Sequence, residues 1–332
     1  MNEHPFNLQG DEYWTKPFKN DRALAERTIF QSQAGLFIDG PPVVDLAVRN
    51  TIPIPVFSCL SQKDALAVPL KRYAYLVATR LEDRQTFTGF AVPRDKPLPQ
   101  APPGAQADES SMVTDNLLPD LKRQVGLGDD PGTYQVVLLL RERASNGVQI
   151  GVSKSGGYAD PEVAKFIEKQ PLPAPAPVTP APGTPLPSYR RSDASPELPQ
   201  TAGIAISAPR VSVLRQGAQV AIAGAFKVPL LKREMTGASP GGQEATAIVP
   251  ITLVAFSSDP GRFGPFVMKM RVPSYDAIAA ADPVGTGYFA IDLLGLPGVQ
   301  PKAATFFVYA FLGEWMSGPA HVGLVTPDML PK

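Results

Sequence analysis

The sequence predicts an all-β protein made of two tandem β-sandwich domains, and three observations point to this fold class. Short apolar runs bounded by turn-forming residues recur along both halves of the 332-residue chain, as in sheet proteins. A stretch rich in proline separates the two halves. Short sequence matches recur in the same order in both halves, which indicates an internal duplication.

Residues 1–30 are expected to form an N-terminal arm. This region mixes charged residues with aromatic ones, including Tyr13 and Trp14, and 20–30 begins with residues that cap helices. Two roles are open for the arm: it packs on the first domain, or it grips a partner.

Residues 31–170 are expected to form the first β-sandwich domain with a short C-terminal helix. Asn146-Gly147 is a strong signal for a hairpin turn, because both residue types tolerate positive φ. Asp160-Pro161-Glu162 predicts the start of a helix that ends near Gln170. The predicted strands are 43–48, 54–60, 72–81, 86–92, 133–143 and 148–154, with one helical turn or two within 114–128.

Residues 171–202 are expected to form a proline-rich linker. Eight of the 17 residues in 171–187 are proline. Such a sequence favours the extended polyproline II conformation, which at ~3.1 Å per residue would span about 50 Å. A recognition motif at 177–180 is the alternative to a simple spacer.

Residues 203–332 are expected to form the second β-sandwich domain. Apolar runs dominate this region, and helix signals are weak. The predicted strands are 203–208, 211–214, 219–226, 247–256, 266–272, 287–294, 305–312 and 320–325.

The strongest internal match aligns 133–152 with 305–324 without gaps. Six of the twenty aligned residues are identical, among them Glu142 and Glu314. Weaker matches keep the same order: 68–72 with 228–233, 76–78 with 253–255, 92–93 with 272–273, and 114–118 with 290–294. These matches indicate duplication of a unit of about 130 residues.

The hairpin-rich layout resembles immunoglobulin-like sandwiches in outline. The resemblance rests on strand rhythm alone, because the single cysteine does not allow the Cys…Trp…Cys spacing of antibody domains. It implies two tandem immunoglobulin-like β-sandwich domains that arose by internal duplication and are joined by the proline-rich linker. Cys59 itself lies in an apolar run and is expected to be buried and unreactive.

Alternation along 305–315 separates two faces of a predicted strand. The residues expected to face the core are Phe306, Val308, Ala310 and Leu312. The opposite face carries Phe307, Tyr309, Phe311, Gly313 and Trp315. Either loops or the arm cover this aromatic face within the chain, or it binds a partner. The candidate partner-binding residues are therefore Phe307, Tyr309, Phe311 and Trp315, together with Tyr13 and Trp14 of the arm.

Residues that carry catalysis are scarce. The chain has two histidines, His4 and His321, and no nucleophile-elbow, phosphate-loop or zinc-protease motif. The loop around Asp259 has the chemistry of a turn rather than of an ion site. We therefore expect no enzyme activity, no catalytic residues, no metal site and no cofactor.

The net charge and the hydropathy of the chain limit the classes of partner and the location to be expected. Lys and Arg total 31 and Asp and Glu total 31, so the net charge is zero, whereas proteins that bind nucleic acid or anionic membranes carry a basic excess. No secretory signal and no run of about 18 apolar residues is present, which predicts a cytoplasmic protein without a transmembrane helix.

The sequence thus favours a non-enzymatic protein-binding, scaffolding or structural-assembly component, with a protein partner or a homo-oligomer. Three alternatives stay open. One is a carbohydrate-binding module that uses Trp315 and Tyr309 as stacking platforms. The others are an accessory domain protein of an enzyme, and an enzyme with an unusual acid-based site.

Overall fold

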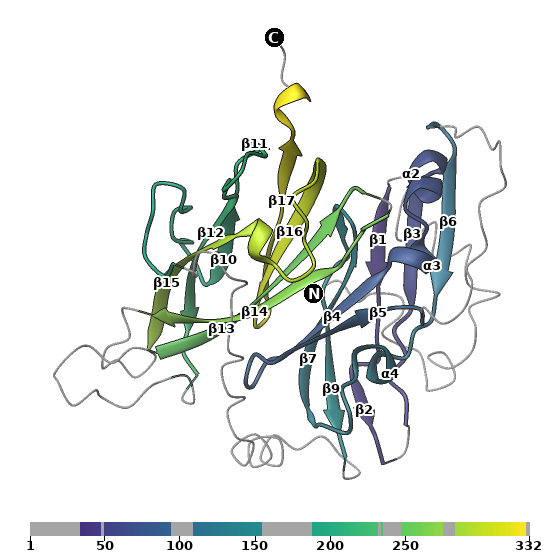
Figure 1. Cartoon of the computed structure of the whole chain (residues 1–332). Coiled ribbons are helices and arrows are strands. Elements are labelled where there is room, and N and C mark those ends of the chain that lie inside the picture. Colours follow the sequence, from purple (N-terminus) through teal and green to yellow (C-terminus); the bar gives the residue numbers. More distant parts are fainter. Residues whose placement is uncertain are drawn as a thin grey trace. The chain divides into compact units, whose positions relative to one another are not determined.

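The computed structural model describes residues 34–47, 50–93, 109–154, 188–231, 234, 247–259, 261–274 and 283–329. The fold is mostly β, with 52% strand and 10% helix, so the predicted fold class is confirmed at this level. The chain divides into two compact units, Met1–Gln170 and Pro171–Lys332, which we describe separately (Figure 1).

The first unit begins with short strands and two short helices. Its elements are β1 (Gly35–Ile38), β2 (Val43–Asp45), β3 (Val56–Ser61), α2 (Gln62–Ala67), α3 (Leu70–Tyr73), β4 (Tyr75–Arg80), β5 (Thr86–Phe90), β6 (Met112–Leu117), α4 (Leu121–Val125), β7 (Gly132–Leu140), β8 (Arg143–Ala144) and β9 (Val148–Ser153).

These strands of the first unit form two sheets. The small sheet has the order β1-β3-β6, and the large sheet has the order β2-β9-β7-β4-β5, with β8 paired to β7. All pairs are antiparallel except β2 with β9. Side chains on both sheets are fully buried, for example Ile38 and Val56 on the small sheet and Val136 and Leu138 on the large one.

The second unit contains the longer strands. Its elements are β10 (Gly203–Ser207), β11 (Val211–Val213), β12 (Ala221–Pro229), β13 (Ala247–Ser257), β14 (Phe266–Ser274), β15 (Val284–Asp292), the 3-10 turn η2 (Leu293–Gly295), β16 (Ala304–Leu312), β17 (Trp315–Val325) and the 3-10 turn η3 (Pro327–Met329). Each of the eight strands predicted in this half overlaps an observed strand.

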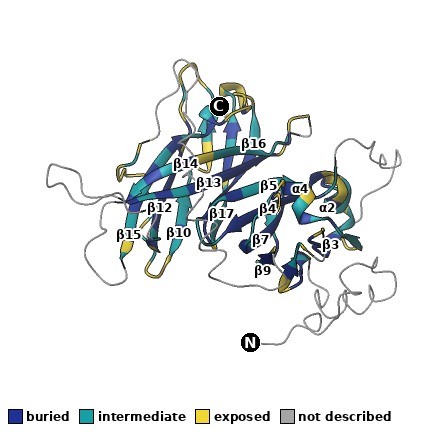
Figure 2. Ribbon diagram, turned by 90° about the horizontal axis from the view of Figure 1, so that it is seen from below, coloured by how far each residue is buried: buried dark blue, intermediate teal, exposed yellow. Residues whose placement is uncertain are grey.

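The second unit has a small sheet of order β10-β12-β15 and a large sheet of order β11-β17-β16-β13-β14. In chain order, these positions repeat those of the first unit strand for strand, including the parallel pairing of β11 with β17. One hydrophobic core draws on both sheets, and it includes Phe226 and Phe289 of the small sheet and Leu253 and Val308 of the large one. Figure 2 shows buried residues along β13 and β16. The predicted core face of β16, from Phe306 to Leu312, lies in this core.

Residues 188–202, here named the strap, contact every strand of the small sheet of the second unit. On β15, the Ser188 amide donates to the Ala290 carbonyl at 2.9 Å, and the reverse bond is 2.7 Å. On β12, Lys227 Nζ donates to the Gln200 carbonyl at 3.0 Å. On β10, the Ser207 hydroxyl donates to the Ala194 carbonyl. This part of the predicted linker is thus a structural element of the second unit.

Two local predictions for the first unit were wrong. The hairpin turn lies at Arg141-Glu142, where Leu140 pairs with Arg143, and not at Asn146-Gly147. Asn146 instead uses its side-chain amide on β1: the Ile38 amide donates to Asn146 Oδ1 and Asn146 Nδ2 donates to the Ile38 carbonyl, both at 2.9 Å. The strand expected at 72–81 begins too early, because Arg72 and Tyr73 belong to helix α3 and β4 starts at Tyr75. Helices α2 and α3, of six and four residues, are too short to show helical periodicity in the sequence.

Several predictions concern residues outside the described ranges. They are the N-terminal arm with its helix, the helix expected at 160–170 and the proline-rich stretch 171–187.

Candidate functional site

The predicted aromatic face of β16 is buried. Phe307, Tyr309 and Phe311 are 8%, 0% and 3% exposed. They alternate along β16 and therefore share one face, opposite the core of the sandwich. Tyr309 meets the Phe256 ring edge-on at 6.4 Å between centroids, and Phe307 meets the His321 ring at 5.1 Å. The structure thus brings these three residues together without exposing them.

Trp315 does not belong to this face. The chain turns at Gly313-Glu314, and Trp315 pairs with Leu312 across the hairpin. Paired residues in an antiparallel hairpin point to the same side, so Trp315 follows the core residue Leu312 and packs against the core cluster. The prediction placed Trp315 on the wrong face because it assumed that strand alternation continues through this turn. Trp315 and Tyr309 consequently do not form a shared stacking platform.

The remaining predicted residues have varied positions. Cys59 is buried, as expected. His321 lies exposed on β17 against Phe307. Tyr13 and Trp14 lie outside the described residues.

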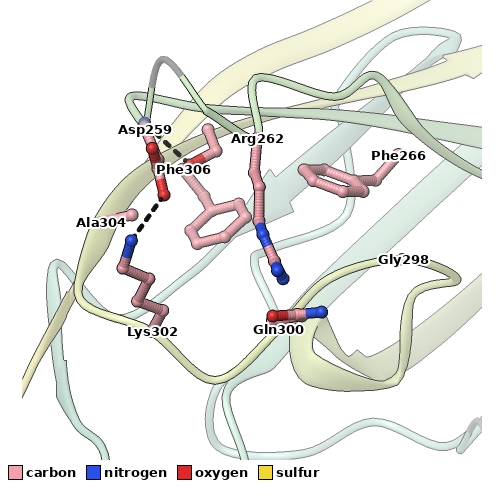
Figure 3. A pocket seen from close by; sticks show the side chains of 9 residues that line it. Asp259, Arg262, Phe266, Gly298, Gln300, Lys302, Ala304 and Phe306 are labelled. Carbon is pink, nitrogen blue, oxygen red and sulfur yellow. Dashed lines mark hydrogen bonds and ion pairs between the residues drawn. The ribbon is translucent and has the colours of Figure 1, made fainter.

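A small pocket lies beside the loop that joins β13 to β14 (Figure 3). Its floor contains the buried Phe306 and the half-buried Phe266, and its rim carries the exposed side chains of Arg262, Gln300 and Lys302. The cavity volume is about 10 Å³, which is the space of about one water molecule. The lining residues are Ser257, Asp259, Arg262, Phe266, Gly298, Gln300, Lys302, Ala304 and Phe306.

Asp259 holds the shape of this loop. The Gly261 amide donates to Asp259 Oδ1 at 2.9 Å, and Lys302 Nζ donates to Oδ2 at 3.2 Å. The hydrogen bond from Gly261, together with Lys302, lowers the pKa of the Asp259 carboxyl. The loop prediction for Asp259 therefore agrees with its contacts, since its charge is used within the turn.

Arg262 differs from its neighbours in the pocket. Its side chain is exposed and points toward Gln300 (Figure 3). Lys302 has Asp259 as an ion-pair partner, whereas no carboxylate of the described residues lies within ion-pairing distance of Arg262. The pocket therefore offers an exposed guanidinium that makes no ion pair with a described carboxylate, although Asp259 attracts it, beside a side-chain amide and two aromatic rings.

The corresponding hairpin of the first unit, β4–β5, is closed in the same way. The Arg80 amide donates to the Gln85 carbonyl, as the Ser257 amide donates to the Phe263 carbonyl, each at 2.9 Å. Here, however, the loop end contains a fully buried arginine. Arg80 Nε and Nη2 donate to the two carboxylate oxygens of Asp83 at 3.0 and 2.7 Å.

Further partners complete the Arg80 cluster. Arg80 Nη2 donates to Gln85 Oε1 at 2.8 Å, and Nη1 lies 3.5 Å from the Asp130 carboxylate. Burial opposes the positive charge, but hydrogen bonds and attraction from Asp83 outweigh it, so the pKa of Arg80 is raised. Burial also raises the pKa of the neighbouring Tyr134, which keeps its phenol protonated. The charge of Arg80 is thus paired by carboxylates of the first unit.

Neither charge site is predicted by the sequence pattern. The Arg262 pocket combines the β13–β14 loop with the segment before β16, which lies about 40 residues further along the chain. The "EDRQ" turn at 82–85 is predicted from the sequence, but the burial of Arg80, which ends the strand before it, is not. A signal was available there: an arginine that ends an apolar strand and precedes two acids has its counter-ions at hand.

Comparisons with known proteins assign no family. No protein-family model matches the chain, and no curated protein matches it. Among the residues that the structure describes, no group of three or more His, Cys, Asp or Glu side chains is placed to hold a metal ion. No helix within the described ranges is long and apolar enough to cross a membrane.

Proposed function

We propose that this chain is a non-enzymatic protein-binding or scaffolding component, built from two copies of one immunoglobulin-like β-sandwich. The observation that carries the binding role is the Arg262 pocket. Enclosed sites for small molecules have volumes of about 300–1,000 Å³. A pocket that admits one water-sized group, with a charged rim over aromatic rings, instead resembles the anchor points of protein interfaces.

Strand pairing supports the duplication. Gly35 pairs with Cys59 in the first unit, and Gly203 pairs with Lys227 in the second, each residue 168 positions further along. Thr133 pairs with Gly151, and Thr305 pairs with Gly323, each 172 positions further along. A shared register is a stronger criterion than shared strand content, because a slip of one residue exchanges the two faces of a strand.

Equivalent polar contacts add to this support. The Ile52 amide donates to Asp120 Oδ1, and the Val220 amide donates to Asp292 Oδ1, both at 2.9 Å. These residues follow the same two offsets as the strands. The polar contact at Ile38 also has a counterpart, since the Ile206 amide donates to Ser317 Oγ at 3.2 Å.

Two of the sequence matches do not fit this register. The match of 68–72 with 228–233 joins a segment after helix α2 to the end of strand β12. The match of 114–118 with 290–294 differs by four residues from the observed pairing, in which Thr114 corresponds to Thr286. The duplication is therefore better supported by the strand register than by these two short sequence matches.

The immunoglobulin-like assignment is supported by topology. Each unit divides its strands between a small and a large sheet, and a short early strand runs parallel to the last strand. Immunoglobulin-like sandwiches likewise divide about seven to nine strands between two mainly antiparallel sheets. Such folds host many functions, so the binding role depends on the pocket and not on the fold.

Native mass measurement and affinity capture test the proposed function. The full chain is isolated from its native extract, and its mass and co-purifying proteins are determined. A stable hetero-complex or homo-oligomer is expected. A monomer that retains no partner, at physiological salt and after gentle cross-linking, would contradict the proposal.

A further inference from the structure

We propose that the Arg262 pocket binds a carboxylate from an acidic segment of a protein partner. This inference rests on the proposed binding function and names the chemistry that the second unit recognises. It makes Arg262 the main donor, Gln300 a second donor, and Phe266 and Phe306 the apolar surface beneath the bound group (Figure 3).

The charge balance of the pocket favours an anion. The one carboxylate that lines it, Asp259, already accepts hydrogen bonds from Lys302 and from the Gly261 amide. Arg262 is also attracted by Asp259 but makes no ion pair with it, so the lining holds two cations and one carboxylate. An arriving carboxylate would pair with Arg262 without displacing an existing ion pair.

The donor chemistry favours a carboxylate over a simple ion. A guanidinium presents a planar fork of N–H groups that fits the two oxygens of a carboxylate. Arg262 points toward Gln300, whose amide adds a neutral donor on the same rim (Figure 3). The cavity of about 10 Å³ admits a group of about the size of one oxygen atom with its hydrogen-bond partners.

The first unit shows a charge-paired arginine at this end of a hairpin. Arg80 donates to both carboxylate oxygens of Asp83, and its Nη1 lies 3.5 Å from the Asp130 carboxylate. In the second unit, the residue that corresponds to Arg80 by strand pairing is Ser257. The loop-closing hydrogen bonds place Arg262 at the position of Arg84, which is 4% exposed in the first unit. The first hairpin thus buries its loop arginine, whereas the second leaves Arg262 exposed and without an ion pair to a described carboxylate.

The exposure of the rim favours a protein segment over a free small acid. The Lys302 side chain is 68% exposed, and Arg262 and Gln300 are exposed as well. A free acid would keep most of its surface in water at such a site and gain little. An acidic segment gains several weak contacts at once, because neighbouring carboxylates remain attached to the same chain.

The test is calorimetric titration of the full chain with acetylated, amidated hexaglutamate, in parallel with the neutral hexaglutamine peptide. Measurable binding of hexaglutamate is expected, with loss of about tenfold in affinity in Arg262→Ala, as for the loss of a charge-assisted hydrogen bond. Arg262→Lys, which keeps the charge and loses the fork, should be intermediate. Arg215→Ala is the matched control, since Arg215 is an exposed arginine in the turn before β12.

Four results would overturn the inference. Hexaglutamate binding that Arg262→Ala reduces no more than Arg215→Ala would show general charge attraction. Binding of hexaglutamine with equal affinity would exclude carboxylate recognition. Propionate that binds as tightly as hexaglutamate would make the ligand a free small acid. A native complex that Arg262→Ala leaves intact would contradict this inference while leaving the proposed function standing.

Discussion

The two hairpins β4–β5 and β13–β14 have equivalent positions in their sheets, but they differ in the burial and ion pairing of their arginines. In the first unit, Arg80 is fully buried and bound to Asp83, Gln85 and Asp130, and the loop residue Arg84 is also buried. In the second unit, Arg262 is exposed, and the local acid, Asp259, pairs with Lys302. The same backbone hydrogen bonds close both loops. The comparison teaches that hairpins of the same topology can bury an arginine in an internal charge network or leave it exposed at the surface.

The largest expected effect separates these two roles. Arg80→Met leaves Asp83 buried without its counter-ion, which should lower the free energy of unfolding by about 3–5 kcal/mol. Arg262→Met removes an exposed arginine and should change it by less than about 0.5 kcal/mol. Urea unfolding of both variants checks this difference. Equal effects would mean that the two arginines do not differ in role.

A second comparison concerns the side chains that tie the first strand of each unit to its last hairpin. Asn146→Ala removes two hydrogen bonds to Ile38, and Ser317→Ala removes one to Ile206. We expect losses of about 2 and about 1 kcal/mol, since each bond contributes about 1 kcal/mol. Unfolding curves measure both. A larger loss for Ser317→Ala would refute the equivalence of the two anchors.

The final hairpin turns differ in the residue that adopts positive φ. Arg141 has φ of 53° and Gly313 has φ of 61°. Gly313→Ala adds a Cβ in the left-handed region and should destabilise the protein by about 1 kcal/mol. Arg141→Gly relieves that strain but frees the unfolded chain, so a change below about 0.5 kcal/mol is expected. Thermal unfolding distinguishes the two, and a costly Arg141→Gly would show that the arginine side chain stabilises the turn.

The smallest expected effect is the pH dependence that Asp259 contributes. Because its pKa is lowered in the folded state, its stabilising contribution is present above the unfolded value of about 3.9 and is lost as pH falls through the lower folded value. Asp259→Asn should be slightly less stable at pH 7, and the difference should shrink towards pH 3. A difference that persists at acidic pH would exclude ionisation of Asp259 as its cause.

The sequence was sufficient where a feature depends on local alternation. Phe306, Val308, Ala310 and Leu312 were assigned to the core because strand side chains alternate, and the core cluster contains all of them. Trp315 was assigned wrongly because a turn at Gly313-Glu314 resets that alternation. The Asn146-Gly147 signal failed for a related reason, since Asn146 bonds to a strand distant in sequence.

The candidate pocket could not be predicted from the sequence. Arg262 and Gln300 belong to different loops, and only the folding of the large sheet of the second unit brings them to one rim. Whether Arg262 makes an ion pair also depends on another residue, because the carboxylate of Asp259 pairs with Lys302. Composition and spacing do not report which of two cations an acid will pair with.

The most direct test of the central claim supplies the second unit with the carboxylate that the first unit already has. Gln300→Glu places an acid of the same size at the position toward which the Arg262 side chain points (Figure 3). If Arg262 acts by binding an incoming carboxylate, this variant should lose hexaglutamate affinity about as strongly as Arg262→Ala. Unchanged affinity in Gln300→Glu, measured by the same calorimetry, would contradict the account.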